Sequence, residues 1–177
     1  MKNAAASPDA PAESTLPEDA SRSAGSAAIG ARLRRLSDRI DRDATQVYTT
    51  LGIAFEQRWY GPLTHIAHSG PLSVSDIANR LRITHVSVSQ AVAALESHGL
   101  VESAPDPADG RRRLLALTGA GRALVDRLTP LWAACNTAAM ELDHAAGQVV
   151  EALDRLEDQL DQVSLFDRIM EKVAPSC

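Results

Sequence analysis

Large apolar side chains recur at helical spacing along most of the chain, but only after its first 26 residues. Residues 1–26 are rich in Ala, Ser, Pro and acidic side chains. A segment with so few apolar residues cannot offset the entropy lost on ordering, so we expect a disordered arm. From residue 27 to about 51 the apolar positions predict a long amphipathic helix; they are Ile29, Leu33, Leu36, Ile40, Val47 and Leu51.

A second helical stretch is expected between residues 55 and 69, where Trp59, Leu63 and Ile66 would face inward. The pair Gly61-Pro62 interrupts this pattern, because proline lacks an N–H donor and clashes with the preceding turn. Two alternatives stay open at this point: the helix starts at Pro62, or it is kinked there.

Two histidines of this stretch, His65 and His68, are three residues apart and share one side of the helix. Imidazoles at this spacing can ligate a metal. No third ligand stands nearby in the sequence, so we predict no metal site.

Residues 73–97 predict two helices joined by a tight turn. Ser73, followed three residues later by Asp76, has the spacing of a cap that starts a short helix. Thr84 is placed to cap a second, longer helix, and Gly99 is placed to end it in a left-handed conformation. The core positions of the longer helix are Val88, Val92 and Leu95.

Two β-prone runs follow, at residues 100–103 and 113–117. They are joined by Pro105-Asp106-Pro107-Ala108-Asp109-Gly110, a composition that favours a turn because Pro presets φ and Asp and Gly adopt turn conformations. Two helices, a tight turn and a two-stranded ribbon with a basic tip make a winged helix-turn-helix. This arrangement is typical of DNA-binding modules.

Two more helices are expected after the ribbon. Thr118 caps the first, and Pro130 should bend it. Its apolar side carries Leu124, Leu128, Leu131, Trp132, Cys135, Ala139 and Leu142. The second would run from about residue 146 to 173 with apolar steps of three and four, a heptad-like seam suited to a partner helix. The seam residues are Val149, Leu153, Leu156, Leu160, Val163, Phe166 and Met170.

The composition indicates a cytoplasmic protein. The chain has two cysteines, Cys135 and Cys177, too few for a disulfide framework, and no apolar run long enough to cross a bilayer. Cys135 falls on the apolar side of its helix with nothing basic adjacent in sequence, so we expect a buried structural thiol. A regulator switched by oxidation of one of these thiols is the alternative.

The net charge of −5 is unevenly distributed along the chain. Residues 141–177 hold nine carboxylates and three basic side chains, whereas residues 73–123 hold six Arg and five carboxylates. Residues 27–50 hold five Arg and three Asp. The positive field that phosphate binding needs is therefore confined to the expected reading module and the first helix.

Several segments resemble the multiple-antibiotic-resistance regulator (MarR) family of bacterial repressors. They are LSVSDIANRL, SVSQAVAALESHGLVE, DPADGRRRLLALT and TGAGRAL, and the triplet Asp109-Gly110-Arg111 matches the Asp-x-Arg wing motif of the family. The resemblance spans roughly residues 27–173. It implies a mostly α fold with a small β-wing: a winged helix-turn-helix at residues 55–118, and dimerisation helices at residues 27–54 and 119–173.

The residues expected to contact DNA come from the second helix and from the wing. On the helix they lie near its N-terminus, away from the core positions: Thr84, His85, Ser87, Ser89 and Gln90. In the wing, strand alternation would place Arg111 and Arg113 on one face and Arg112 on the other. By the resemblance, Arg111 enters the minor groove and Asp109 braces it.

The predicted function is that of a homodimeric transcriptional regulator, a repressor released from a pseudo-palindromic operator by a small effector. The resemblance implies an aromatic acid bound in a crevice near Trp59, His65 and Trp132. The sequence has no nucleophile triad, Gly-rich phosphate loop or suitable carboxylate pair, so neither an enzyme nor a cofactor is predicted. A winged protein-interaction module without DNA binding is the alternative from another class.

Overall fold

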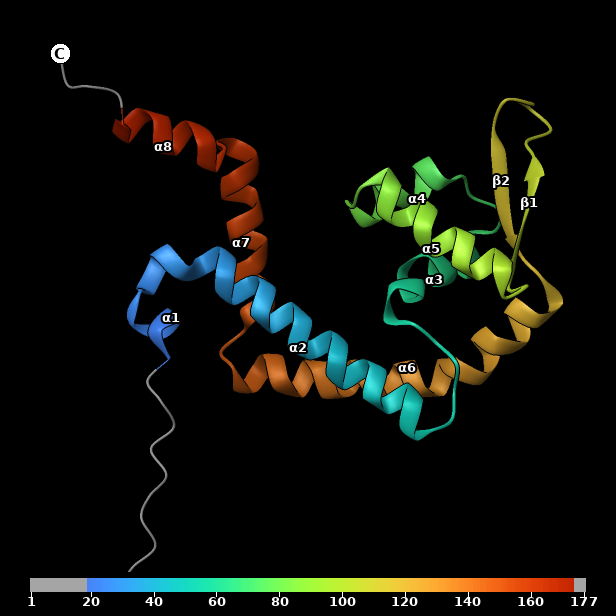
Figure 1. Ribbon diagram of the computed structural model, residues 1–177, viewed down its shortest axis with the longest axis horizontal. Coiled ribbons are helices and arrows are strands. Elements are labelled where there is room, and N and C mark those ends of the chain that lie inside the picture. Colours follow the sequence, from blue (N-terminus) through green and yellow to red (C-terminus); the bar gives the residue numbers. More distant parts are fainter. Residues whose placement is uncertain (1–18, 174–177) are drawn as a thin grey trace, which may run out of the picture. The chain divides into compact units, whose positions relative to one another are not determined.

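The computed structural model describes residues 19–173 (Figure 1). They form two compact parts that divide after residue 57. The N-terminal part contains α1 (Ala20–Ser23), the short 3-10 helix η1 (Gly25–Ala28) and α2 (Ile29–Thr50). Helix α2 is the long amphipathic helix expected from the apolar spacing. Its stripe is exposed at Ile29, Leu33, Leu36 and Ile40.

The prediction of a disordered arm over residues 1–26 is wrong where the structure describes that segment. Asp19 caps α1 by accepting a hydrogen bond from the backbone N–H of Ser21 at 3.0 Å. The guanidinium of Arg35 donates two further bonds to the same carboxylate, at 3.1 and 2.8 Å. These bonds, first those from Arg35, lower the pKa of Asp19 far below its usual range. Residues 1–18 lie outside the described residues.

The second part begins with the predicted winged helix-turn-helix. Helix α3 (Tyr60–Ser69) precedes α4 (Val74–Leu81) and α5 (His85–Ser97), and strands β1 (Val101–Pro105) and β2 (Arg113–Leu117) form the wing (Figure 1). The helices enclose an apolar core. Its most deeply buried side chains are Trp59, Leu63, Ile77, Val88, Leu95 and Leu128.

The expected caps set the helix boundaries. Ser73 and Asp76 form a capping box at the start of α4, and Thr84 accepts from the backbone N–H of Ser87 at the start of α5. After α5, Gly99 has a φ of 66°, as expected for a residue that ends a helix in the left-handed region. Arg82 ends α4 with a φ of 51°, which is uncommon for a residue other than glycine.

The start of α3 settles the question of Pro62. A short 3-10 helix, η2 (Gln57–Trp59), leads into α3, so Pro62 stands in the first helical turn. The backbone N–H groups of that turn have no partner within the helix, so a proline costs little there. The helix therefore begins at Tyr60, slightly before the proline.

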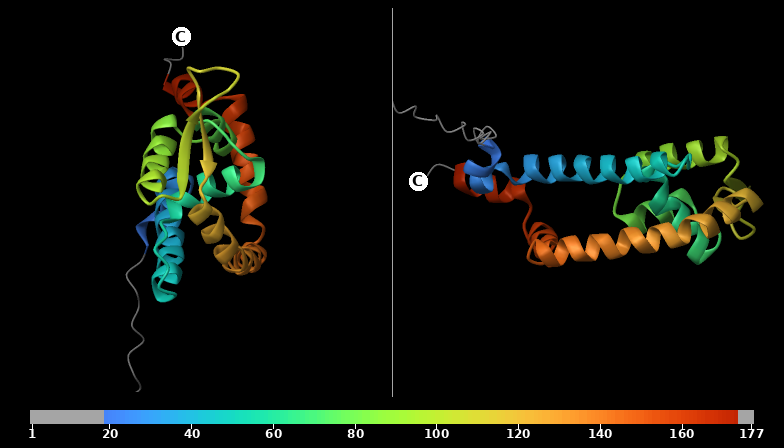
Figure 2. Two further views of the ribbon diagram at one scale, coloured as in Figure 1. Left: turned by 90° about the vertical axis from the view of Figure 1, so that its right-hand side faces the viewer. Right: turned by 90° about the horizontal axis from the view of Figure 1, so that it is seen from below.

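The wing is an antiparallel hairpin (Figure 2). Val101 pairs with Leu117 and Pro105 with Arg113. The segment before α4 extends the pairing, because Leu72 and Leu115 exchange backbone hydrogen bonds of 3.1 and 2.8 Å. The wing is thus attached directly to the helix-turn-helix through the backbone.

The last helices differ from the prediction at one point. Helix α6 (Gly119–Ala145) continues through Pro130, but the expected single helix at residues 146–173 is divided into α7 (Val149–Gln162) and α8 (Leu165–Val173). Val163 is extended, and Ser164 caps the new helix by accepting from the backbone N–H of Asp167 at 3.1 Å. Most of the seam is exposed, at Val149, Leu160, Val163, Phe166 and Met170.

Cys135 is exposed on α6 and not buried as predicted. The apolar side of α6 is covered only near the winged module, where Leu128 is fully buried. Cys177 lies outside the described residues. No helix between residues 19 and 173 has the length and apolar content needed to span a membrane.

The junction between wing and α6 generates a test of the fold. A Cβ atom at Gly121 would lie 2.0 Å from the backbone carbonyl oxygen of Leu100, which cannot swing away as a side chain can. We expect Gly121→Ala to lower the free energy of unfolding by about 3 kcal/mol, the upper end for an overpacked site. Urea unfolding of the full chain measures this change.

Gly119→Ala is the matched control, because a Cβ atom there meets nothing within 4 Å. Its stability should stay within about 1 kcal/mol of the parent chain, since alanine is the better helix former. Equal stability of the two variants would contradict this packing of α6 against Leu100.

Candidate functional site

The exposed face at the start of α5 contains residues with different roles. The hydroxyl of Thr84 accepts from the backbone N–H of Ser87 at 3.2 Å and lies 2.8 Å from the Ser87 hydroxyl. The hydroxyl of Ser89 lies 3.3 Å from Nδ1 of His85. These four side chains are engaged in contacts within the helix start, whereas Gln90 is exposed and makes no hydrogen bond with another described residue.

Sequence reasoning missed one residue of this face. Val86, in the first turn of α5, leaves 64% of its surface exposed. The core positions of the helix are filled by Val88, Val92 and Leu95, so Val86 has no part in the core. The signal was present in the sequence, because Val86 is out of step with the apolar spacing.

At the tip of the wing, Asp109 shapes the backbone. Its carboxylate accepts from the backbone N–H of Arg111 at 3.1 Å, and its carbonyl accepts from the backbone N–H of Arg112 at 2.8 Å. Asp109 therefore braces the backbone of the turn that carries Arg111. It does not bond to the guanidinium of Arg111. The Arg111 side chain is exposed and forms no ion pair within residues 19–173.

The next arginine attaches the wing to the capping box of α4. The guanidinium of Arg112 bonds to the carboxylate of Asp76 and donates to the hydroxyl of Ser73 at 3.2 Å. Its Nε also lies 4.0 Å from Asp106. Hydrogen bonds from Ser73, with a smaller contribution from Arg112, hold the pKa of Asp76 below its usual range. Arg112 thus has a structural partner that the sequence analysis did not identify.

Arg113 is engaged within the hairpin. It donates to the hydroxyl and to the carbonyl of Ser103 on β1, at 2.7 and 2.6 Å. The expected alternation of three arginines along one strand does not hold, because β2 begins only at Arg113 and the other two belong to the turn. Arg111 is the member of the run whose guanidinium has no hydrogen bond or ion pair with another residue between 19 and 173.

A hollow of about 520 Å³ separates the start of α5 from the wing. It brings together four of the predicted DNA-contacting residues, His85, Asp109, Arg111 and Arg113, with Arg112 and the start of α4. The other predicted contacts, Thr84, Ser87, Ser89 and Gln90, do not line it. A helix start and a cationic turn therefore flank one concave surface.

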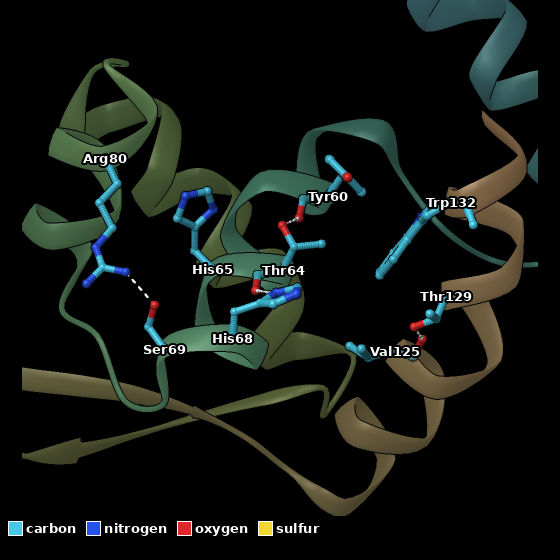
Figure 3. A pocket seen from close by; sticks show the side chains of 10 residues that line it. Tyr60, Thr64, His65, His68, Ser69, Arg80, Val125, Thr129 and Trp132 are labelled. Carbon is cyan, nitrogen blue, oxygen red and sulfur yellow. Dashed lines mark hydrogen bonds between the residues drawn. The ribbon is translucent and has the colours of Figure 1, made fainter. Parts of the chain in front are cut away.

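A larger pocket of about 630 Å³ lies between α3, α6 and the end of α4 (Figure 3). One end is aromatic: the rings of Tyr60 and Trp132 meet edge to face with centroids 5.1 Å apart. Val125 and Thr129 of α6 continue this wall.

The other end of the pocket is polar. Arg80 donates to the hydroxyl of Ser69, and His65 and His68 lie between it and the aromatic end (Figure 3). Nδ1 of His65 is 2.9 Å from the carbonyl of Gly61, and Nδ1 of His68 is 2.7 Å from the carbonyl of Thr64. Because a carbonyl only accepts, each Nδ1 carries a proton. No carboxylate lines the pocket, so its polar end suits an anion.

The expected effector residues divide between two places. His65 and Trp132 line this pocket, but Trp59 does not. Trp59 is 1% exposed and belongs to the core. The centroid of its ring lies 4.8 Å from that of the His98 ring. Its neighbour Tyr60 lines the pocket in its place. Among the described residues no group of three His, Cys, Asp or Glu side chains is arranged to hold a metal.

Comparisons with known proteins confirm the resemblance and the fold class. Residues 55–112 match the MarR family. Over 63 residues the chain is 35% identical to an HTH-type transcriptional regulator of Mycobacterium tuberculosis, an alignment that covers 36% of this chain and 44% of that protein. The chain thus matches less than half the length of this curated relative.

Two solved structures are similar over more of the chain. One is the PcaV transcriptional regulator of Streptomyces coelicolor in complex with its natural ligand, with 25% identity, a TM-score of 0.57 and coverage of 70% of this chain and 89% of that one. The other is BpsR of Bordetella bronchiseptica, whose DNA binding is regulated by 6-hydroxynicotinic acid. Its identity is 25%, its TM-score 0.61, and the coverage 73% and 93%.

The attachment of the wing by Arg112 can be tested directly. We expect Arg112→Gln to speed amide hydrogen exchange at residues 106–112 and to leave exchange in α5 unchanged, because only the turn loses its anchor. The cost in global stability should be at most about 1 kcal/mol, since the pair is partly exposed. Arg127→Gln, at an exposed position of α6, is the control.

The anchor should also depend on pH in one direction. Folding lowers the pKa of Asp76. The ionised carboxylate therefore contributes to stability above the usual carboxyl pKa, and this contribution is lost as the pH falls through the lowered value. The difference between Arg112→Gln and the parent chain should therefore be constant from about pH 6 to 8. A difference that disappeared within that window would show that another group holds the turn.

Proposed function

Since residues 55–112 match the MarR family across the helix-turn-helix and the wing turn, we propose that this chain is a transcriptional regulator that binds duplex DNA. The single observation that carries the proposal is the concave surface between the start of α5 and the wing, which is lined by the exposed Arg111. A helix of this kind fits the major groove. Arg111 would then reach the adjacent minor groove.

The start of α5 is suited to lie near the DNA backbone. The first backbone N–H groups of a helix lack partners within the helix and attract phosphate. Thr84 satisfies only that of Ser87. The remaining donors and the wing arginines form a positive edge, although the chain as a whole carries a net charge of −5.

We further propose that the protein acts as a homodimer and as a repressor. Its apolar stripes on α2, α7 and α8 are exposed in the single chain. Exposed apolar surface of this extent is costly in water and is typical of an interface. A second copy of the chain would cover this surface. Each copy would then read one half-site of a pseudo-palindromic operator, and the centres of the two half-sites would lie about one helical turn apart.

The pocket between α3, α4 and α6 would hold the effector. An aromatic acid would place its ring against Tyr60 and Trp132 and its carboxylate near Arg80. The structural similarity to a regulator controlled by 6-hydroxynicotinic acid supports this ligand class. Binding would favour the conformation in which the two reading helices misfit the operator.

The DNA proposal is tested by Arg111→Ala, assayed by fluorescence anisotropy on operator duplex selected with the full chain. Losing one groove contact should weaken specific binding by about 1–3 kcal/mol, roughly 5- to 150-fold, and reduce the salt dependence by about one phosphate equivalent. The thermal midpoint should be unchanged, because the exposed Arg111 side chain forms no hydrogen bond or ion pair with another described residue. Arg127→Ala, on an exposed face of α6, is the matched control.

Unchanged affinity of Arg111→Ala would remove this residue from the DNA interface. If the parent chain also showed no salt-dependent affinity for any duplex, the protein-interaction module would be the better interpretation. A loss of DNA affinity on treatment with peroxide, reversed by thiol, would favour the thiol-switched alternative.

The effector proposal is tested with Arg80→Gln and small aromatic acids, by isothermal titration. Losing a charge-assisted bond should weaken acid binding by about 1.5–3 kcal/mol. The affinity for operator without ligand should be unchanged. The corresponding uncharged aromatic alcohols should bind both proteins alike.

Because linkage is reciprocal, operator should weaken acid binding by the factor by which the acid weakens operator binding. Equal acid affinity of parent and variant would place the carboxylate elsewhere.

A further inference from the structure

The reading face of α5 has an unusual chemical composition for a DNA-binding helix. Its thirteen residues, HVSVSQAVAALES, include a single charged side chain, Glu96, near the C-terminal end. Arg and Lys are the usual ligands of guanine in the major groove, and Asp and Glu accept from cytosine. The start of this helix therefore lacks the side chains that read G·C pairs by charge.

The polar side chains of this face are also largely engaged. The hydroxyls of Thr84 and Ser87 lie 2.8 Å apart within the cap, and that of Ser89 lies 3.3 Å from Nδ1 of His85. Ser89 is also half-buried. These contacts reduce the number of groups that are free to approach a base edge.

Two exposed side chains of this face, Val86 and Gln90, are not engaged in such contacts. Val86 is 64% exposed in the first turn, and the exposed Gln90 has no hydrogen bond with another described residue. They are four positions apart and so share one face of the helix, separated by about 6 Å along its axis. This distance corresponds to one or two base-pair steps of about 3.4 Å.

We infer that Val86 is a specificity-determining residue that packs on the C5-methyl group of a thymine, with Gln90 bound to an adenine one or two base pairs away. Apolar side chains contact the thymine methyl, and a glutamine amide can bond to both N6 and N7 of adenine. The centre of each half-site would then consist of A·T pairs. The inference rests on the proposed DNA-binding function and names the sequence class which that surface reads.

A solvent-exposed valine alone would be unremarkable, since single apolar residues are common on protein surfaces. Its position distinguishes it here. Val86 lies on the same face as the uncommitted amide and away from the buried Val88, and the neighbouring turn residue Ile83 is also 46% exposed. Two β-branched side chains thus surround Thr84, the cap at which the helix would enter the groove.

The test replaces thymine by deoxyuridine, which removes the C5-methyl and leaves the base-pairing groups intact. Operator duplex is first selected from random DNA with the full chain, and each thymine is then replaced in turn. At one position per half-site, the loss of one buried methyl should weaken binding about fourfold, and about 15-fold when both half-sites are changed.

Val86→Ala supplies the second arm of the experiment. The variant should bind the unmodified operator more weakly by a similar factor and should no longer distinguish thymine from deoxyuridine at that position. Its thermal midpoint and its affinity for non-operator duplex should equal those of the parent chain, because Val86 lies outside the core and phosphate contacts are untouched. Gln90→Ala should instead relax the preference for adenine at the neighbouring pair.

Two results would overturn the inference and leave the proposed function intact: a selected operator with G·C pairs at the centre of each half-site, or a Val86→Ala variant that retains the full penalty for deoxyuridine. The first would indicate that His85 or a wing arginine reads guanine. If random DNA yielded no enriched duplex at all, the proposed function would fail, and this inference with it.

Discussion

One arginine attaches the tip of the wing to a helix cap and so shapes the candidate DNA surface, in addition to the backbone pairing of Leu72 with Leu115. Arg112 bonds to Asp76 and Ser73, which together form the capping box at the start of α4. The carboxylate of Asp76 therefore both holds the wing in place, through Arg112, and caps the start of α4. Because its neighbour Arg112 is engaged in this way, Arg111 is the arginine of the turn that remains available to a ligand.

A second joint connects the wing to α6. Thr118 accepts from the backbone N–H of Gly121 and donates to the carbonyl of Gly99, and its own N–H bonds to the carbonyl of Leu100. The end of α5, the hairpin and the start of α6 meet at these backbone groups. A ligand between α3 and α6 would therefore act on an element that is joined to the wing by short, directional bonds.

Much of the winged module could be predicted from the sequence, because its boundaries are set by local interactions. The cap at Ser73, the cap at Thr84 and the left-handed Gly99 each depend on residues a few positions away. The spacing of apolar residues identified Val88 and Leu95 as core for the same reason. Local rules and tertiary packing agree there, so the fold class followed from sequence alone.

The sequence by itself thus determined the winged fold, the position of the turn and the helix face that carries the candidate contacts. Only the tertiary structure decided that Arg112 and Arg113 are engaged while Arg111 is free, since a long flexible side chain can reach several partners. It likewise kept the predicted core residue Trp59 out of the pocket between α3 and α6 and left Cys135 exposed. These outcomes depend on which surfaces meet in space, and periodicity along one chain does not contain that information.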